Sequence, residues 1–207
     1  EARDKVIMGA RREDMMNDDE KEIIAYHEAG HTLLARMLPG SDPVQKVTII
    51  PRGRSLGATE QIPEEERHNI SKSYLLNRIT IMLGGRAAEK LMFDELTTGA
   101  GDDLKRVTKI ARRMITQWGM SEKLGPVTFN IGEDHVFLGR EMTQQKDFSE
   151  ETAREIDKEI QHIVHDMQEK AISTLQENKD KLEKLAQSLV ENETLEKEDI
   201  DSILGTK

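Results

Sequence analysis

Cysteine is absent from this chain of 207 residues, and aromatic residues make up only 3% of it. Without cysteine, the chain has no disulfide scaffold and no zinc site built on thiolates. With so few aromatic residues, aliphatic side chains must fill the core. That composition suits helices with hydrated outer faces better than a β-sandwich, which is rich in aromatic and β-branched residues. We therefore expect a mainly α-helical fold.

Long apolar runs and basic tracts are also missing. No apolar run approaches the ~20 residues that a membrane-spanning helix needs, and no signal peptide is visible. The formal net charge is -10, so binding to nucleic acid through phosphate neutralisation is not expected. At this length the chain can still bury a substantial core, as one large domain or two small ones.

The spacing of apolar residues and helix breakers predicts helices around one small β-sheet. Asn17 to Glu20 offer capping side chains and early negative charge for the first helix, and Pro39-Gly40 ends it. Gly84-Gly85 predicts an interruption or close packing within another helix. The fold class is therefore mainly α with a small β-sheet and a C-terminal helical bundle. The predicted helices span 17–38, 70–93, 104–119, 149–178 and 179–204, and the predicted strands lie within 43–51 and 55–63.

The stretch AYHEAGH, residues 25–31, places two histidines one helical turn apart. Residues four apart differ by only ~40° around a helix, so His27 and His31 can direct their imidazoles at one metal ion. Glu28 points ~100° away from His27, too far to be a ligand beside it, but it can reach a water molecule at the ion and act as a general base. The alternative is a pair of half-buried histidines in an ordinary amphipathic helix.

A catalytic zinc site takes three protein ligands, so a third must come from elsewhere. A third histidine on the same segment would need Gly and His where the chain has Leu34 and Met37. The other four histidines lie in polar, loop or charged stretches, so a carboxylate is the better candidate. A glycine-rich loop before a helix favours the pair Asp102 and Asp103, one of which we expect to cap that helix, and Glu89 is a candidate to orient a histidine by hydrogen bonding. The carboxylates considered are Glu89, Asp94, Glu95, Asp102 and Asp103.

Six motifs in order resemble the protease domain of the FtsH family of ATP-dependent zinc metalloproteases. The resemblance runs from about residue 3 to residue 141, and the helices beyond it are similar to the C-terminal bundle of the family. The motifs are AYHEAGH, DPVQKVTIIPRG, LGGRAAE, TTGAGDDLKRVTKIARRM, WGMSEKLGPV and VFLGR.

The resemblance implies a zincin-like HExxH helix that binds one Zn²⁺ per chain. By it, His27, His31 and Asp103 are the metal ligands and Glu28 is the general base. Asp102 stands where the family commonly has asparagine, which places a second carboxylate beside the site.

The resemblance also implies an organisation and a setting. Residues 1–16 are expected to be a linker from an upstream ATPase module that uses ATP, residues 17–148 the zinc peptidase core, and residues 149–207 the helical bundle of the same protease domain. The chain carries no GxxxxGK[ST] phosphate loop. The expected assembly is a homo-hexamer at the bacterial inner membrane or its organelle equivalent, facing the cytoplasm, with membrane contact only through N-terminal segments outside this sequence.

The expected function is endopeptidase cleavage of unfolded or damaged polypeptides. An extended substrate would pair with a sheet edge, for which Gly57, Ala58, Thr59 and Glu60 are the candidates. Two alternatives stay open: a non-catalytic ring-assembly module with a structural metal, and a metal-dependent amidase that acts on small molecules.

Overall fold

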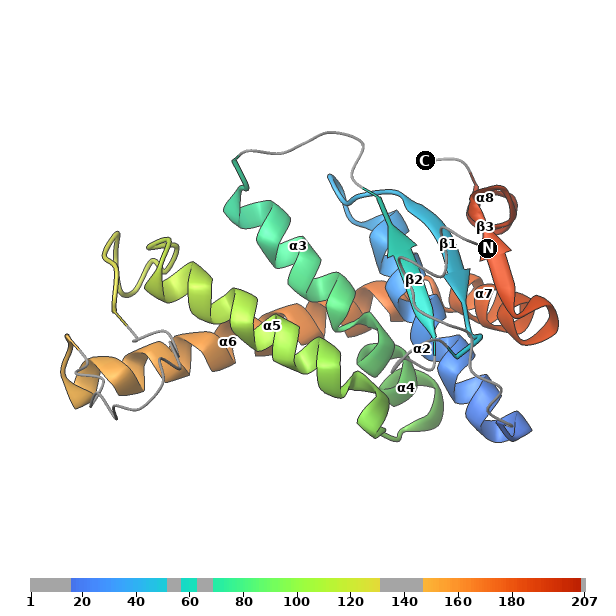
Figure 1. Cartoon of the computed structure of the whole chain (residues 1–207), viewed down its shortest axis with the longest axis horizontal. Coiled ribbons are helices and arrows are strands. Elements are labelled where there is room, and N and C mark those ends of the chain that lie inside the picture. The colour runs from blue at the N-terminus through green and yellow to red at the C-terminus, as the bar shows by residue number, and fades with distance from the viewer. Residues whose placement is uncertain (1–15, 52–56, 63–68, 131–146, 206–207) are drawn as a thin grey trace, which may run out of the picture.

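The computed structural model describes residues 16–51, 57–62, 69–130 and 147–205. Within these ranges helices dominate, and one three-stranded sheet lies at one end of the molecule (Figure 1). This confirms the predicted mainly α fold with a small sheet. Residues 1–15 of the predicted linker, His68 and His135 lie outside the described residues.

The helix that carries the two histidines, α2 (Asp18–Met37), begins and ends where the sequence predicts. Asn17 accepts a hydrogen bond from the backbone of Glu20, whose side chain accepts one from the backbone of Asn17, which completes a capping box. Leu38 adopts an extended conformation at the C-terminal end, before Pro39-Gly40. This helix is buried on all sides from Ala25 to Ala35, because other elements surround it.

Helices and the sheet enclose α2. The helices α4 (Gly84–Phe93) and α7 (Lys179–Asn192) pack against it, and strand β1 (Val44–Thr48) contacts it as well. In Figure 1, α3 (Lys72–Met82) and α5 (Gly101–Thr116) lie side by side, and the long helix α6 (Glu150–Glu177) contacts both. The resulting core is aliphatic, as the composition predicts.

The sheet is antiparallel in the order β2-β1-β3, with β2 at Ala58–Gln61 and β3 at Thr194–Glu196. Val47 in the central strand pairs with Thr59 on one side and with Leu195 on the other. Among the described residues β2 pairs only with β1, which makes it an edge strand of the sheet.

Three predicted details of the elements are wrong. The stretch 179–204 is not one helix: α7 ends at Asn192, β3 follows, and α8 (Lys197–Leu204) closes the chain, because Glu193 takes a left-handed conformation that breaks the helix. The helix predicted from 104 begins at Gly101, directly after the short 3₁₀ helix η1 (Thr98–Ala100). No aspartate caps α5, whose N-cap residue is Ala100 without a side-chain hydrogen bond.

The predicted helix 70–93 is divided at Leu83, beside Gly84-Gly85, into α3 and α4.

No helix in the described ranges combines the length and the apolar character that crossing a membrane requires.

Candidate metal centre

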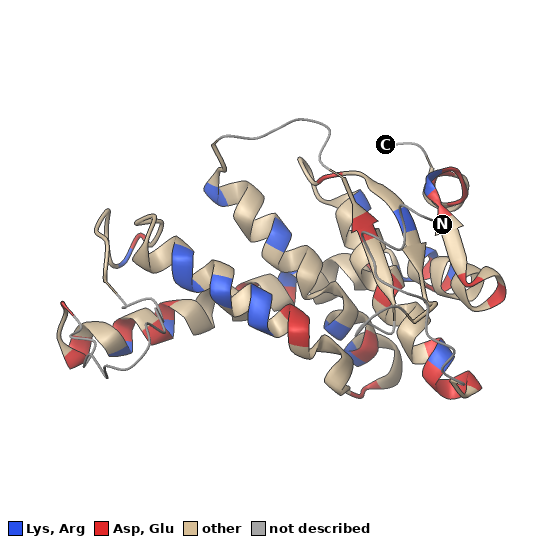
Figure 2. Cartoon of the chain, in the orientation of Figure 1, with Lys and Arg blue, Asp and Glu red and all other residues tan. Residues whose placement is uncertain are grey.

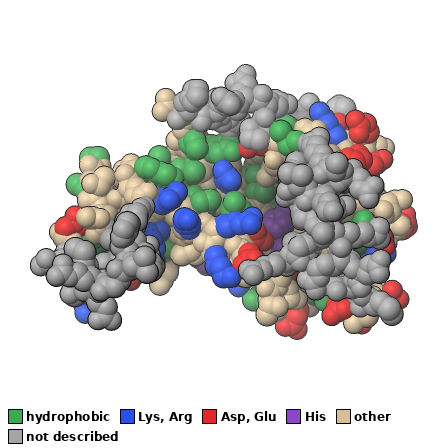
Figure 3. Space-filling model, viewed as in Figure 1, with side chains coloured by type: hydrophobic (Ala, Val, Ile, Leu, Met, Phe, Trp, Pro, Cys, Tyr) green, Lys and Arg blue, Asp and Glu red, His purple; other side chains and the backbone are tan. Residues whose placement is uncertain are grey.

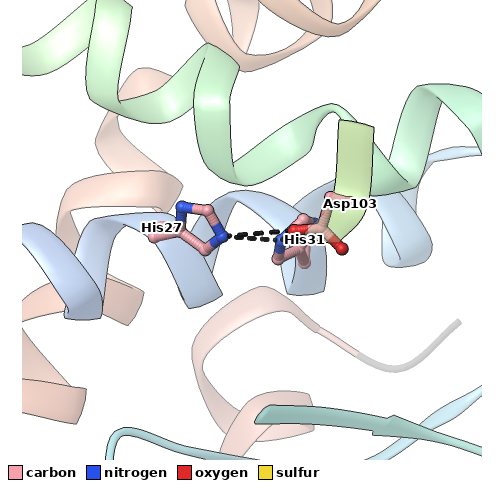
Figure 4. A group of neighbouring side chains, drawn as sticks. All are labelled: His27, His31 and Asp103. Carbon is pink, nitrogen blue, oxygen red and sulfur yellow. Dashed lines mark hydrogen bonds and ion pairs between the residues drawn. The ribbon is translucent and has the colours of Figure 1, made fainter. Parts of the chain in front are cut away.

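Helix α2 presents His27 and His31 on one side, where their rings meet edge to face (Figure 4). The Nδ1 atom of His27 lies 2.6 Å from Oε1 of Glu89, and Nδ1 of His31 lies 2.7 Å from the carbonyl oxygen of Ile81. A carbonyl oxygen can only accept a hydrogen bond, so Nδ1 of His31 donates the proton. Both rings are therefore fixed through Nδ1, and both Nε2 atoms face the same point.

Asp103 faces these two nitrogens from the first turn of α5 (Figure 4). Its Oδ2 atom lies 3.5 Å from Nε2 of His27 and 3.3 Å from Nε2 of His31. The two Nε2 atoms are 3.1 Å apart. In the part of the chain that the structure describes, these three residues form the one group of His, Asp or Glu ligand atoms close enough to hold a metal ion.

These separations fit a tetrahedral zinc ion. With zinc–nitrogen and zinc–oxygen bonds of about 2.0–2.1 Å, tetrahedral geometry separates two ligand atoms by roughly 3.3–3.4 Å. The observed range of 3.1–3.5 Å matches that value. The lone pairs of the two Nε2 atoms and of Oδ2 would repel one another if no cation lay between them. The three atoms together therefore favour a positive charge at this point.

The pKa values of His27 and Asp103 also indicate that the site favours a positive charge. Burial lowers the pKa of His27, but hydrogen bonds to Asp103 and Glu89 outweigh it and raise that pKa to about 10. Burial raises the pKa of Asp103, whereas the two histidines beside it hold that pKa well below its usual range. Without a metal, a proton on His27 supplies the positive charge. A metal ion bonded to all three atoms would supply it more completely.

Glu89 is almost fully buried, at 1% exposure, and its carboxylate lies against His27. It accepts hydrogen bonds from the backbone nitrogen of Thr97 at 2.9 Å and from the Thr97 hydroxyl at 3.2 Å, besides the contact with His27. Burial raises the pKa of Glu89, but the hydrogen bonds from His27 and Thr97 lower it below its ordinary value. The carboxylate therefore stays charged against the far side of the His27 ring.

Glu28 is buried at 6% exposure, between α2 and strand β2. The hydroxyl of Thr59 donates a hydrogen bond to Oε2 of Glu28 at 2.8 Å. A Cβ atom at Gly57 would lie 2.6 Å from Oε1 of Glu28, so the carboxylate lies directly against the backbone just before β2. Two of the four predicted edge residues thus contact the predicted base.

The model of peptidase family M41 matches residues 14–203, which is most of the chain. The chain belongs to peptidase family M41. Its similarity to curated relatives is high: an ATP-dependent zinc metalloprotease FtsH of Nitrosococcus oceani is 52% identical over 202 residues, which cover 98% of this chain and 32% of the relative.

Other relatives give the same result. The ATP-dependent zinc metalloprotease FtsH 4 of Sphaerobacter thermophilus is 50% identical over 205 residues, covering 99% of this chain and 31% of the relative. The FtsH of Pelobacter propionicus is 49% identical over 205 residues, covering 99% of this chain and 33% of the relative. The chain thus spans about a third of the length of these relatives. The predicted resemblance to the FtsH family is confirmed, and with it the prediction of a metalloprotease domain.

In this M41 chain the other candidate carboxylates lie away from the histidines. Asp102 pairs with Lys105 at 2.7 Å, and its side chain is 73% exposed. Asp94 pairs with Lys90 on the surface, and Glu95 is exposed. His162 is also exposed and lies 3.3 Å from Asp166 on α6.

Figure 3 shows histidine side chains beside a hollow on one face of the molecule. A shallow depression along α5 runs away from the first turn of that helix and is lined by Leu104, Lys105, Lys109 and Arg112, among others. Lysine and arginine residues follow the outward face of α5 (Figure 2). The surface beside the metal centre is therefore positively charged, although the whole chain is acidic.

Several residues of the site carry no sequence signal that identifies them. The carbonyl of Ile81 contacts His31 only because α3 ends there, and Thr97 reaches Glu89 through a turn in which its hydroxyl also accepts a hydrogen bond from Gly99. A Thr-Thr-Gly sequence is compatible with such a turn but does not specify its partner. Thr59 was predicted only as part of a substrate edge, not as a contact of Glu28.

Proposed function

We propose that this chain is a zinc endopeptidase domain in which His27, His31 and Asp103 bind the metal and Glu28 is the general base. The observation that carries the proposal is the set of three separations between Nε2, Nε2 and Oδ2, all from 3.1 to 3.5 Å. Both imidazoles are already oriented through Nδ1, as metal-binding histidines are. The names of the relatives, zinc metalloproteases, support zinc as the metal.

The chemistry follows from the groups present. A zinc ion in this site would polarise the scissile carbonyl and lower the pKa of a water molecule toward ~7. Glu28 accepts a proton from the attacking water as the oxygen bonds to the carbonyl carbon. When the carbon–nitrogen bond breaks, Glu28 delivers that proton to the departing amine. Glu89 and the carbonyl of Ile81 keep the two imidazoles in place throughout.

The substrate is proposed to lie along the outer edge of β2, as an added strand. Gly57, Ala58, Thr59 and Glu60 would bind its backbone, which suits an enzyme that cleaves unfolded polypeptides of many sequences. This placement is supported by the contact of β2 with Glu28, since the strand that binds the peptide then lies beside the base.

A purely structural metal is the less supported alternative. Structural zinc sites are usually closed by four protein ligands, whereas catalytic sites leave one position open. The described residues offer three ligand atoms, with the Glu28 carboxylate close enough to His27 to affect its pKa. The arrangement therefore favours a catalytic metal over an assembly role.

The larger setting is also a proposal. We infer that the chain works within a homo-hexameric, ATP-dependent protease anchored in the bacterial inner membrane, with this domain on the cytoplasmic side. The relatives, which are named ATP-dependent, support the requirement for ATP.

Casein digestion by the zinc-loaded wild type, compared with Glu28→Gln of equal zinc content, tests the proposed function. Casein also separates an endopeptidase from an amidase that acts only on small molecules, because the amidase would leave it intact.

A further inference from the structure

The hydroxyl of Thr59 sits among oxygen atoms of α2. Its shortest contact is the 2.8 Å hydrogen bond to Oε2 of Glu28. The backbone oxygen of Glu28 and the hydroxyl of Thr32 lie farther away, both at 3.5 Å. A threonine hydroxyl has one proton to donate, and a carboxylate is the strongest acceptor of the three. The proton therefore goes to the Glu28 side chain.

The second oxygen of this carboxylate is confined by Gly57, the residue directly before β2. A Cβ atom built at Gly57 would lie 2.6 Å from Oε1, 2.8 Å from Cγ and 3.0 Å from Cδ of Glu28. Only glycine leaves room for the carboxylate there. Thr59 and Gly57 thus restrain both oxygens of Glu28, Thr59 by a hydrogen bond and Gly57 by close packing.

We propose that Thr59 is a positioning residue for the reaction and holds the Glu28 carboxylate at the angle from which it takes the proton. The inference rests on the proposed function, since it assigns Thr59 a task that exists only if Glu28 is the base. A free glutamate side chain has several rotamers, and each rotamer that points away from the water is unproductive. The hydrogen bond removes these rotamers.

The placement of Thr59 has a consequence for substrate binding. Its side chain contacts the base, and in the described part of the chain the same short strand lies at the edge of the sheet. A peptide that pairs with this edge stabilises the strand, and through Thr59 the strand stabilises the orientation of the Glu28 carboxylate. Substrate binding and the orientation of the base are then linked through Thr59.

The kinetic test compares Thr59→Val, which keeps the shape and removes the hydroxyl, with Thr59→Ser, which keeps the hydroxyl. In the complete protein that carries this chain, with ATP and zinc, Thr59→Val is expected to lower kcat for casein about 10- to 100-fold. KM and zinc content are expected to stay within about twofold of the wild type, and Thr59→Ser to retain most of kcat. Thr116→Val is the matched control, because the buried Thr116 donates its hydroxyl to the carbonyl of Arg112, within its own helix α5.

A second readout does not depend on activity. In the zinc-free protein, denaturant unfolding of Thr59→Val, Glu28→Ala and the double variant forms a double-mutant cycle. The two residues are in contact, so the shift in midpoint of the double variant is expected to be clearly different from the sum of the two single shifts. Additive shifts would overturn the contact itself.

The outcomes separate this inference from the proposed function. Full activity of zinc-loaded Glu28→Gln would show that Glu28 is not the general base, and the proposed function would fail. Loss of activity in Glu28→Gln together with full kcat in Thr59→Val overturns the role of Thr59 alone. If Thr59→Val does not fold, Thr59→Ser and Thr59→Ala, which differ only by the hydroxyl, take its place. Equal kcat in those two variants then contradicts the inference.

Discussion

At the scale of single residues, the third metal ligand is the sharpest assignment. Asp103→Asn is expected to lower zinc affinity strongly, because the change removes the charge of Oδ2 at 3.3–3.5 Å from both histidine nitrogens. Asp102→Asn is the matched control, since Asp102 is exposed and pairs with Lys105. For Glu89→Gln we expect an intermediate loss of zinc affinity, ~10–100-fold, which is typical when a group that orients a metal ligand is changed.

Zinc retention against a graded series of chelators measures all three variants. Loss of zinc in Asp102→Asn with retention in Asp103→Asn would move the ligand by one residue. Loss only in Glu89→Gln would mean that the ligand set is wrong.

How far residue roles can be predicted depends on whether they are local in sequence. The relation of His27 to His31 follows from helical periodicity alone, because both lie on one helix. The choice between Asp102 and Asp103 could not be made from spacing, since either could start the helix, and it needed a family resemblance. The contact between Thr59 and Glu28 joins a strand to a helix 31 positions away in sequence, and no local pattern records it.

At the scale of elements, the metal centre depends on a close crossing of α2 and α4. A Cβ atom at Gly30 would lie 2.3 Å from the carbonyl oxygen of Gly84, and one at Gly85 would lie 2.4 Å from the His27 ring. Backbone therefore meets backbone at the crossing, and the ring of His27 rests on a glycine. The sequence predicts an interruption or close packing at Gly84-Gly85 but does not say which helix approaches.

Gly30→Ala is expected to destabilise the fold by about 1–3 kcal/mol, the usual cost of overpacking, because neither backbone can move aside without shifting a helix. Gly101→Ala is the control: nothing lies within 4 Å of its Cβ position, so the change should be neutral or slightly stabilising. Denaturant midpoints of the two variants measure the difference. Equal stability of both would contradict the close crossing.

Strand β3 is the element that the sequence does not predict. It has three residues, Thr194–Glu196, between two charged helices, so the alternation of apolar and polar residues is too short to predict a strand. Its reason for being a strand is tertiary: Leu195 is buried opposite Val47 in β1. The C-terminal region thereby supports the sheet whose other edge lies beside Glu28.

At the scale of the whole molecule, a hexameric ring is the expected assembly. Large apolar side chains stay exposed in the described chain, among them Trp118 and Val127, each 44% exposed, near the end of α5. Such residues are typical of surfaces that another subunit covers, although single exposed apolar residues are also common. Analytical ultracentrifugation at increasing concentration is expected to show association toward six copies. A strictly monomeric profile at the highest concentration would count against the ring.

The central claim, that Glu28 is the base of a zinc peptidase, is tested most directly by one substitution. Glu28→Gln keeps the size and a hydrogen-bond acceptor for Thr59, so the variant should fold and bind zinc as the wild type does. Glutamine cannot accept the proton, and loss of a general base lowers rates by ~10²–10⁴-fold. The measurement is the casein cleavage rate of both proteins at equal, measured zinc content. We predict a zinc-loaded variant with almost no cleavage, and near-normal cleavage by that same zinc-loaded variant would contradict the account.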